Sequence, residues 1–294
     1  MYDSPALYHD VWVALCRAAE CTTTIGLGPA VLVPNLRHPL TTAAAIATLA
    51  EVAPGRTVVA IGTGFTGRMA MGQKPLTWKY VREHIQQLQG LLRGETVEVD
   101  GAMVKMLQPA GFGARRPIEV PIIVAANGPK GLDVAKHLGA GVMTIGGGQP
   151  EFAWCAALTM GTVLDDGESA GSARALAAAG PGLTVVFHGM YESNPDFVTR
   201  LPGGSVWRAN LEAIPHAVRH LATHEDHLVA VTERDRALLD PMLLQQFTWT
   251  GTRTEISKRI AAAEASGVTE VLYAPMGPDV GRELRAFAEA AGIG

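Results

Sequence analysis

The sequence has few cysteines, no excess of basic residues and no long apolar run. Its 294 residues hold 24 Lys and Arg against 28 Asp and Glu, a net charge of −4, so no basic face is implied and we expect no nucleic-acid partner. No apolar stretch reaches the roughly 18 residues that a membrane helix needs. The first ten residues carry two acids and no positive charge, unlike a signal peptide. We therefore expect a cytoplasmic protein with no membrane partner.

The three cysteines, Cys16, Cys21 and Cys155, form no CxxC pair, and three is an odd number. A disulfide framework is not expected in a chain of this size, so we predict free thiols. The sequence also has no GxSxG elbow and no Walker A motif, which leaves hydrolases and phosphotransferases without a positive signal.

Four histidines, His216, His220, His224 and His227, follow one another at near-helical spacing. Such a group could hold a metal, but Leu221-Ala222 stands where an HExxH motif needs its Glu. We therefore predict a solvated helix face and no metal site.

Short apolar runs alternate with longer amphipathic runs along the whole chain. This alternation predicts a parallel sheet covered by helices, which is either an open doubly wound sheet or a closed barrel. With 48% apolar residues and no repeat or linker, we expect one domain over residues 1–294. The expected strands are 24–33, 57–61, 121–126, 141–145, 183–188 and 270–274, the expected helices are 10–21, 41–51, 77–93, 132–138, 253–266 and 282–291, and a hairpin is expected at 96–106.

The turn Gly62-Thr63-Gly64, with Gly67, has the spacing of a GxGxxG fingerprint. That fingerprint also expects an acidic residue about twenty positions later, after a second strand. Here the corresponding span is the predicted helix 77–93, so we do not expect a nicotinamide site of the Rossmann type.

Four predicted strand ends combine small residues with exposed backbone amides: 29–35, 62–67, 127–130 and 146–148. Active sites of parallel α/β proteins lie at the carboxyl ends of strands, and small residues let a planar ring or a phosphate approach the backbone. Residues 127–130 also precede a helix, whose first amides favour an anion, and Lys130 adds a positive charge. These ends are the candidate binding site.

Taken in order, the motifs resemble the luciferase-like oxidoreductases, and most of all the branch around methylenetetrahydromethanopterin reductase. The resemblance covers nearly the whole chain. The matching pieces are Asp3-Ser4-Pro5, Asp10-Val11-Trp12, residues 25–31, Arg37-His38-Pro39, Pro54-Gly55-Arg56, residues 61–64, Gly72-Gln73-Lys74-Pro75, residues 125–130 and Gly251-Thr252.

The resemblance implies a (β/α)8 barrel of the TIM type, usually dimeric, with reduced coenzyme F420 or a flavin at its strand ends. Its match begins just after the family's second strand, so it predicts a barrel that lacks the first two strands. Ala30-Val31 would form a bulge, often with a cis peptide, behind the ring system, and Thr63-Gly64 would line the ring. The phosphate would lie against Asn127, Gly128, Pro129 and Lys130, and the cofactor site would extend to Gly146 and Gly147.

Two positions depart from the branch: Phe65 stands where it often has Asp, and Val33 where it often has Asn. Both changes remove polar groups near the cofactor. The leading hypothesis is an F420-dependent oxidoreductase, expected to be a homodimer, that transfers hydride to or from a small organic substrate. The alternatives are an FMN-dependent monooxygenase and a non-catalytic flavin-binding relative. No residue is identified as the catalytic acid or base.

Overall fold

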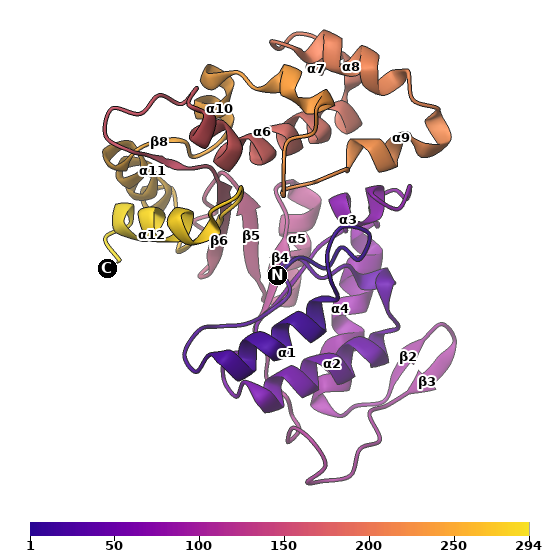
Figure 1. Cartoon of the computed structure of the whole chain (residues 1–294). Coiled ribbons are helices and arrows are strands. Elements are labelled where there is room, and N and C mark those ends of the chain that lie inside the picture. The colour runs from indigo at the N-terminus through magenta and orange to yellow at the C-terminus, as the bar shows by residue number, and fades with distance from the viewer. Residues whose placement is uncertain (294) are drawn as a thin grey trace. The chain divides into compact units, whose positions relative to one another are not determined.

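The computed structural model describes residues 1–293, which form two compact units, Met1–Met143 and a second unit that begins at Thr144 (Figure 1). Within the described residues, no helix is both long and apolar enough to cross a membrane. The three cysteines are free thiols, as predicted. The organisation as one domain stays a prediction.

The first unit is built on parallel strands in the order β1 (Val59–Ile61), β4 (Ile122–Ala125) and β5 (Gly141–Ile145), and the last two residues of β5 belong to the second unit. In the register, Ile61 pairs with Val124, and Ala125 pairs with Met143. The predicted first strand, 24–33, is present only as two parallel bridges to the β1 side, Leu27 with Thr57 and Leu32 with Ile61. These pairings bring the carboxyl ends of neighbouring segments to one edge.

Helices of the first unit follow the predicted pattern. In α4, residues Val81, Ile85, Leu88 and Leu92 follow one another at helical spacing and are all buried, and Gly94 ends the helix in the left-handed conformation. The unit contains α1 (Val11–Cys21), η1 (Pro34–Leu36), α2 (Pro39–Val52), α3 (Phe65–Met69), α4 (Trp78–Arg93), the hairpin β2 (Val97–Val99) and β3 (Ala102–Val104), and α5 (Pro129–Leu138).

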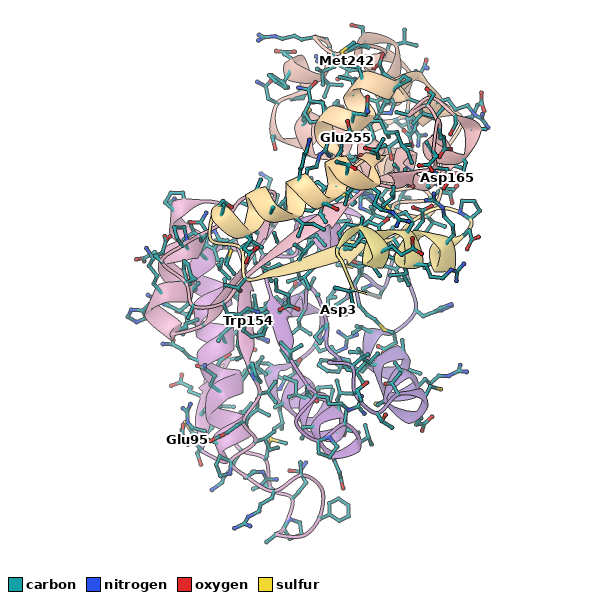
Figure 2. The ribbon with its side chains drawn as sticks, turned by 90° about the vertical axis from the view of Figure 1, so that its left-hand side faces the viewer. Asp3, Glu95, Trp154, Asp165, Met242 and Glu255 are labelled. Carbon is teal, nitrogen blue, oxygen red and sulfur yellow. The ribbon has the colours of Figure 1, made fainter. Side chains whose placement is uncertain are left out.

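The second unit contains two pairs of parallel strands, β6 with β9 and β7 with β8. At the start of β6, the Trp154 indole N–H donates to the Glu270 carboxylate over 2.8 Å (Figure 2). A capping box joins Thr252 and Glu255. The elements are β6 (Cys155–Met160), β7 (Val163–Leu164), α6 (Ala173–Ser193), α7 (Pro195–Val198), α8 (Gly204–Glu212), α9 (His216–Thr223), η2 (Arg234–Leu238), α10 (Pro241–Phe247), β8 (Gly251–Thr252), α11 (Arg253–Ala265), β9 (Glu270–Ala274) and α12 (Val280–Ala290).

Two secondary-structure predictions in this unit are wrong. Residues 183–188 are not a strand but the middle of the 21-residue helix α6, where Leu183 and Phe187 pack into a helical core. Conversely, no strand was expected between 145 and 183, yet residues 155–160 form the strand β6, paired along its length with β9. In both cases tertiary packing outweighs local propensity.

Candidate functional site

Three strand ends of the first unit lie side by side. A methyl group built on Gly62 would lie 3.0 Å from Val31 Cγ1 and 3.3 Å from the Ala125 Cβ atom. A side chain at Gly62 would therefore press on both neighbouring segments. The edge predicted for binding is present, with 30–33, 62–64 and 125–130 along it.

Ala30 and Val31 occupy the first of these ends. Their peptide bond is cis, as the resemblance implies. The Ala30 N–H donates to the Met1 carbonyl over 2.6 Å, and the Leu32 N–H donates to the Ala60 carbonyl over 2.7 Å. Both Ala30 and Val31 are half-buried, so part of this end faces away from the core.

Thr63 and Gly64 form the second end. Gly64 has a φ of +74° and precedes α3 as its N-cap. A methyl group there would lie 2.5 Å from Val33 Cγ1, so both the backbone conformation and the packing require glycine. Phe65, which replaces a polar residue of the related branch, is 44% exposed.

Asn127, Gly128, Pro129 and Lys130 form the third end, and all four are exposed. Pro129 is the first residue of α5, and the N-cap residue Gly128 supplies no side-chain hydrogen bond to the helix. A methyl group on Gly128 would meet no heavy atom within 4 Å. An uncapped helix start with open space and a nearby Lys fits an anion such as a phosphate.

Gly146 and Gly147 belong to the second unit. Both are exposed, and a methyl group on either would meet no heavy atom within 4 Å. The Thr144 hydroxyl donates to the Gly147 carbonyl over 2.6 Å and fixes the turn. That these glycines contact the cofactor stays a prediction, as it does for the eight site residues of the first unit.

A buried carboxylate, that of Asp3, lies next to the first strand end, and the sequence motifs did not predict its role. Asp3 is 2% exposed, and its carboxylate accepts the Val33 N–H over 3.2 Å and the Arg37 guanidinium over 2.8 Å (Figure 2). Arg37 also donates to Asp10 over 2.9 Å. Burial lowers the pKa of Arg37, but the two carboxylates outweigh it and raise that pKa. This ion pair holds the chain at Val33, the position where the sequence departs from the related branch.

Two histidines of the first unit have different environments. The His38 side chain accepts the Leu40 N–H over 3.1 Å and caps α2, which is a structural role. His84 is 2% exposed in α4, and its Nε2 atom has no hydrogen-bond partner. Burial, together with the nearby His38, lowers the pKa of His84 to about 4.

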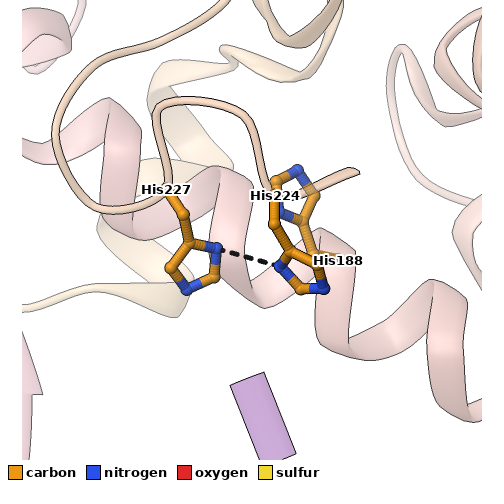
Figure 3. A group of neighbouring side chains, drawn as sticks. All are labelled: His188, His224 and His227. Atoms are coloured by element: carbon orange, nitrogen blue, oxygen red, sulfur yellow. Dashed lines mark hydrogen bonds between the residues drawn. The ribbon is translucent and has the colours of Figure 1, made fainter. Parts of the chain in front are cut away.

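The histidines expected on a solvated helix face are not all solvated. His216 is exposed and His220 is half-buried, but His224 and His227 are only 4% and 5% exposed. The prediction failed because α9 ends at Thr223, so the last two histidines leave the helix and turn inward. Burial, and after it the charge of nearby His188, lowers the pKa of His224 to about 4 and that of His227 to about 3. Figure 3 shows that His188 joins them.

Comparison with known proteins places this geometry in a family. The sequence model described as luciferase-like monooxygenase matches residues 2–270. The 5,10-methylenetetrahydromethanopterin reductase of Archaeoglobus fulgidus is 29% identical over 297 aligned residues, which cover 94% of this chain and 85% of that protein.

Two solved structures show the fold. The coenzyme F420-dependent tetrahydromethanopterin reductase of Methanopyrus kandleri matches with a TM-score of 0.65 and 20% identity. The match covers 98% of this chain and 88% of the reductase chain. The oxygenating constituent of 3,6-diketocamphane monooxygenase from Pseudomonas putida, in complex with FMN, matches with a TM-score of 0.54 and 16% identity. This match covers 95% of this chain and 80% of the monooxygenase chain. The predicted luciferase-like α/β fold is confirmed. Residues 1–293 contain seven strands paired in parallel, namely β1, β4, β5, β6, β9 and the short pair β7 and β8, which is fewer than the eight of a closed barrel.

Proposed function

The chain belongs to the luciferase-like monooxygenase family, and from that premise we propose that it is an oxidoreductase that uses coenzyme F420 for hydride transfer to or from a small organic substrate. The similarity to the archaeal reductase over 94% of the chain favours this branch. The observation that carries the proposal is the shared edge of three strand ends in the first unit, closed by the uncapped start of α5.

The three strand ends together provide two binding functions, one for the ring and one for the phosphate. The small residues at Ala30 and Gly64 leave the backbone open to a flat ring. The amides at the start of α5 and the Lys130 ammonium stabilise a phosphate. The bound coenzyme supplies the hydride chemistry, so the protein has to bind the coenzyme and orient it toward the substrate. No side chain of this edge is assigned as an acid or base.

Cofactor choice is the decisive test. The purified protein is titrated with F420 and, separately, with FMN, and binding is followed by the fluorescence of each cofactor. We expect F420 to bind at least tenfold more tightly than FMN, a difference of about 1.4 kcal/mol. Binding of neither cofactor would contradict the proposal, and binding of F420 without turnover on a panel of alcohols, imines and alkenes would indicate a non-catalytic relative.

An FMN-dependent monooxygenase is the second candidate. Phe65 and Val33 place apolar side chains around Gly64, where the F420 branch often has polar ones. A solved structure of the same fold binds FMN. Oxygen uptake that requires both reduced FMN and an added organic substrate would favour this candidate over the first.

We propose further that the protein works as a homodimer in the cytoplasm. Dimers are usual for the family that the motifs resemble, and three free thiols fit a reducing compartment. Light scattering on the eluting peak of a sizing column measures the mass directly. A mass near twice the 31.0 kDa of the chain is expected.

A further inference from the structure

Three buried histidines of the second unit point their rings at one another (Figure 3). His188 comes from α6, His224 caps the carboxyl end of α9, and His227 lies in the turn that follows. They are 2%, 4% and 5% exposed. One ring nitrogen from each lies within 4.8 Å of the corresponding nitrogen of the other two.

Three of the six ring nitrogens in this group have no hydrogen-bond partner. Both ring nitrogens of His188 and Nε2 of His224 are buried without one. A buried polar atom left unpaired costs stability, so such atoms are rare and call for an explanation. Unpaired imidazole nitrogens gathered in one group are the ligand type that a transition-metal ion takes.

The distance between two of the rings suits a metal better than a direct contact. His224 Nδ1 and His227 Nδ1 face each other at 3.4 Å, which is long for a hydrogen bond. Two imidazole nitrogens bound to one tetrahedral zinc, each about 2.0–2.1 Å from it, lie about 3.3 Å apart. The spacing already present is therefore close to that of a zinc site.

The backbone around His227 holds a costly conformation. Asp226 and Leu228, on either side of it, have φ values of +52° and +60°. A left-handed conformation is uncommon for Asp and rare for Leu, and it persists only where the surroundings impose it. This turn directs His227 back toward His224, which is the effect that a shared ligand would stabilise.

A buried carboxylate supports the group from outside. The Asp235 carboxylate lies 3.6 Å from His188 Nε2 and accepts the Trp207 indole N–H over 2.7 Å and the Thr232 hydroxyl over 2.8 Å. Trp207 also stacks on the His188 ring, with centroids 5.6 Å apart. Histidines that bind zinc commonly have such a carboxylate partner, which orients the ring. Arg234 lies 3.9 Å from the same carboxylate and shares its charge.

We propose that His188, His224 and His227 bind one divalent transition-metal ion of the zinc class and thereby tie the end of α9 to α6. Imidazole nitrogens suit zinc, copper, nickel and cobalt, and three of them leave a fourth position that water takes in three-ligand zinc sites. The proposal does not depend on the redox cofactor, because all the residues that carry it belong to the second unit.

Metal binding is measured on the full chain without F420 or FMN. The protein is stripped with a chelator, dialysed and reconstituted with Zn²⁺ or Co²⁺, and the bound metal is counted by elemental analysis. We expect one Zn²⁺ per chain, intense visible absorption of a tetrahedral Co²⁺ complex, and a rise in Tm of about 5–10 °C at free Zn²⁺ a hundred times Kd.

Matched variants identify the site. His188→Gln and His227→Gln should each lower metal affinity at least tenfold and remove the cobalt spectrum. The control is a double variant, His216→Gln with His220→Gln, which removes the exposed His216 and the half-buried His220 one turn apart on α9 and should leave both readouts unchanged. Circular dichroism tests whether each variant is folded. If either His188→Gln or His227→Gln is unfolded, the metal affinity of the other variant decides the test.

Three results would overturn the proposal. The first is a reconstituted protein that binds less than a tenth of an equivalent of Zn²⁺. The second is metal binding that survives both His188→Gln and His227→Gln. The third is binding that disappears in the double control variant, which would place the metal on the surface of α9.

Discussion

His84 lies on the buried face of α4, and its Nε2 atom has no hydrogen-bond partner. Burial first, and then the nearby His38, lower its pKa from 6.5 to about 4. Between these two values the unfolded chain binds a proton that the folded chain does not, so the free energy of unfolding falls as the pH falls from about 6.5 to about 4. The full difference is ~3 kcal/mol, at about 1.4 kcal/mol per pKa unit.

His84→Gln removes this proton-linked loss. We expect the variant to lose less stability than the parent between pH 7 and pH 5, although it is less stable at pH 7 because an amide replaces a packed ring. His137→Gln is the control, since that histidine is exposed in the last turn of α5. Urea unfolding at both pH values gives the comparison, and an unchanged pH dependence in His84→Gln would contradict the assignment.

The start of α5 combines one tightly packed glycine with one open glycine. A methyl group on Gly131 would lie 2.4 Å from the Trp78 ring and 2.6 Å from the Ala126 Cβ atom, whereas one on Gly128 would meet nothing within 4 Å. Gly131→Ala should therefore cost about 2 kcal/mol through overpacking. Gly128→Ala should change stability by less than about 0.5 kcal/mol.

Cofactor binding separates these two variants further. If the phosphate lies at the start of α5, the methyl group of Gly128→Ala enters its space, and F420 affinity should fall several-fold in a protein of unchanged Tm. Differential scanning fluorimetry and a fluorescence titration measure the two effects. Unchanged affinity in Gly128→Ala would move the phosphate away from this helix.

Helix α6 shows what local sequence patterns leave open. Residues 183–188 contain adjacent valines and follow Gly-Pro-Gly, which predicts a strand after a turn. Yet Leu183, Phe187 and Tyr191 recur every four residues and are buried in one core, the helical spacing that decides the structure. The glycines before them allow close packing, since a methyl group on Gly182 would lie 2.9 Å from the Met160 sulfur. Such contacts depend on residues far apart in the chain.

The site divides in the same way. Glycines and a helix start are visible in a sequence, so the motifs predicted three strand ends that the fold brings to one edge; that the cofactor binds there stays a prediction. The inward turn at His224 and His227 was not predictable from spacing, which assumed that α9 continues. The contribution of His188, some 36 residues earlier, required the packing of α6.

A buried glutamate connects three elements of the second unit. Glu283 of α12 is 2% exposed and accepts the Thr162 hydroxyl over 2.6 Å, and Arg174 of α6 and Arg282 over 3.0 Å each. Glu283→Gln removes the buried anion that the two guanidinium groups share, while Arg174 keeps Glu168 and Arg282 keeps Asp165 as partners. Because the arginines are partly exposed, the expected cost is about 2 kcal/mol.

The exposed pair of Glu289 with Arg253 supplies the control for this prediction. Glu289→Gln should change stability by less than about 0.5 kcal/mol, as is usual for solvent-exposed ion pairs. Urea midpoints of both variants at pH 7 test the difference. Equal midpoints would mean that the buried network contributes no more than the surface pair.

At the scale of the whole molecule, the net charge of −4 opposes the approach of a phosphate-tailed cofactor. Lys130 at the start of α5 supplies a local charge of the opposite sign. Lys130→Gln should therefore raise the Kd for F420 about tenfold at low salt, while Lys105→Gln, an exposed lysine next to the β2–β3 hairpin, should leave it within about twofold.

The salt dependence provides a sharper test than the Kd alone. Added salt screens both the attraction to Lys130 and the repulsion by the whole chain. In the parent the local attraction dominates, so Kd should rise with salt. In Lys130→Gln only the repulsion remains, so Kd should stay level or fall. Titrations from 20 to about 300 mM NaCl compare the two slopes, and identical slopes would show that Lys130 does not face the phosphate.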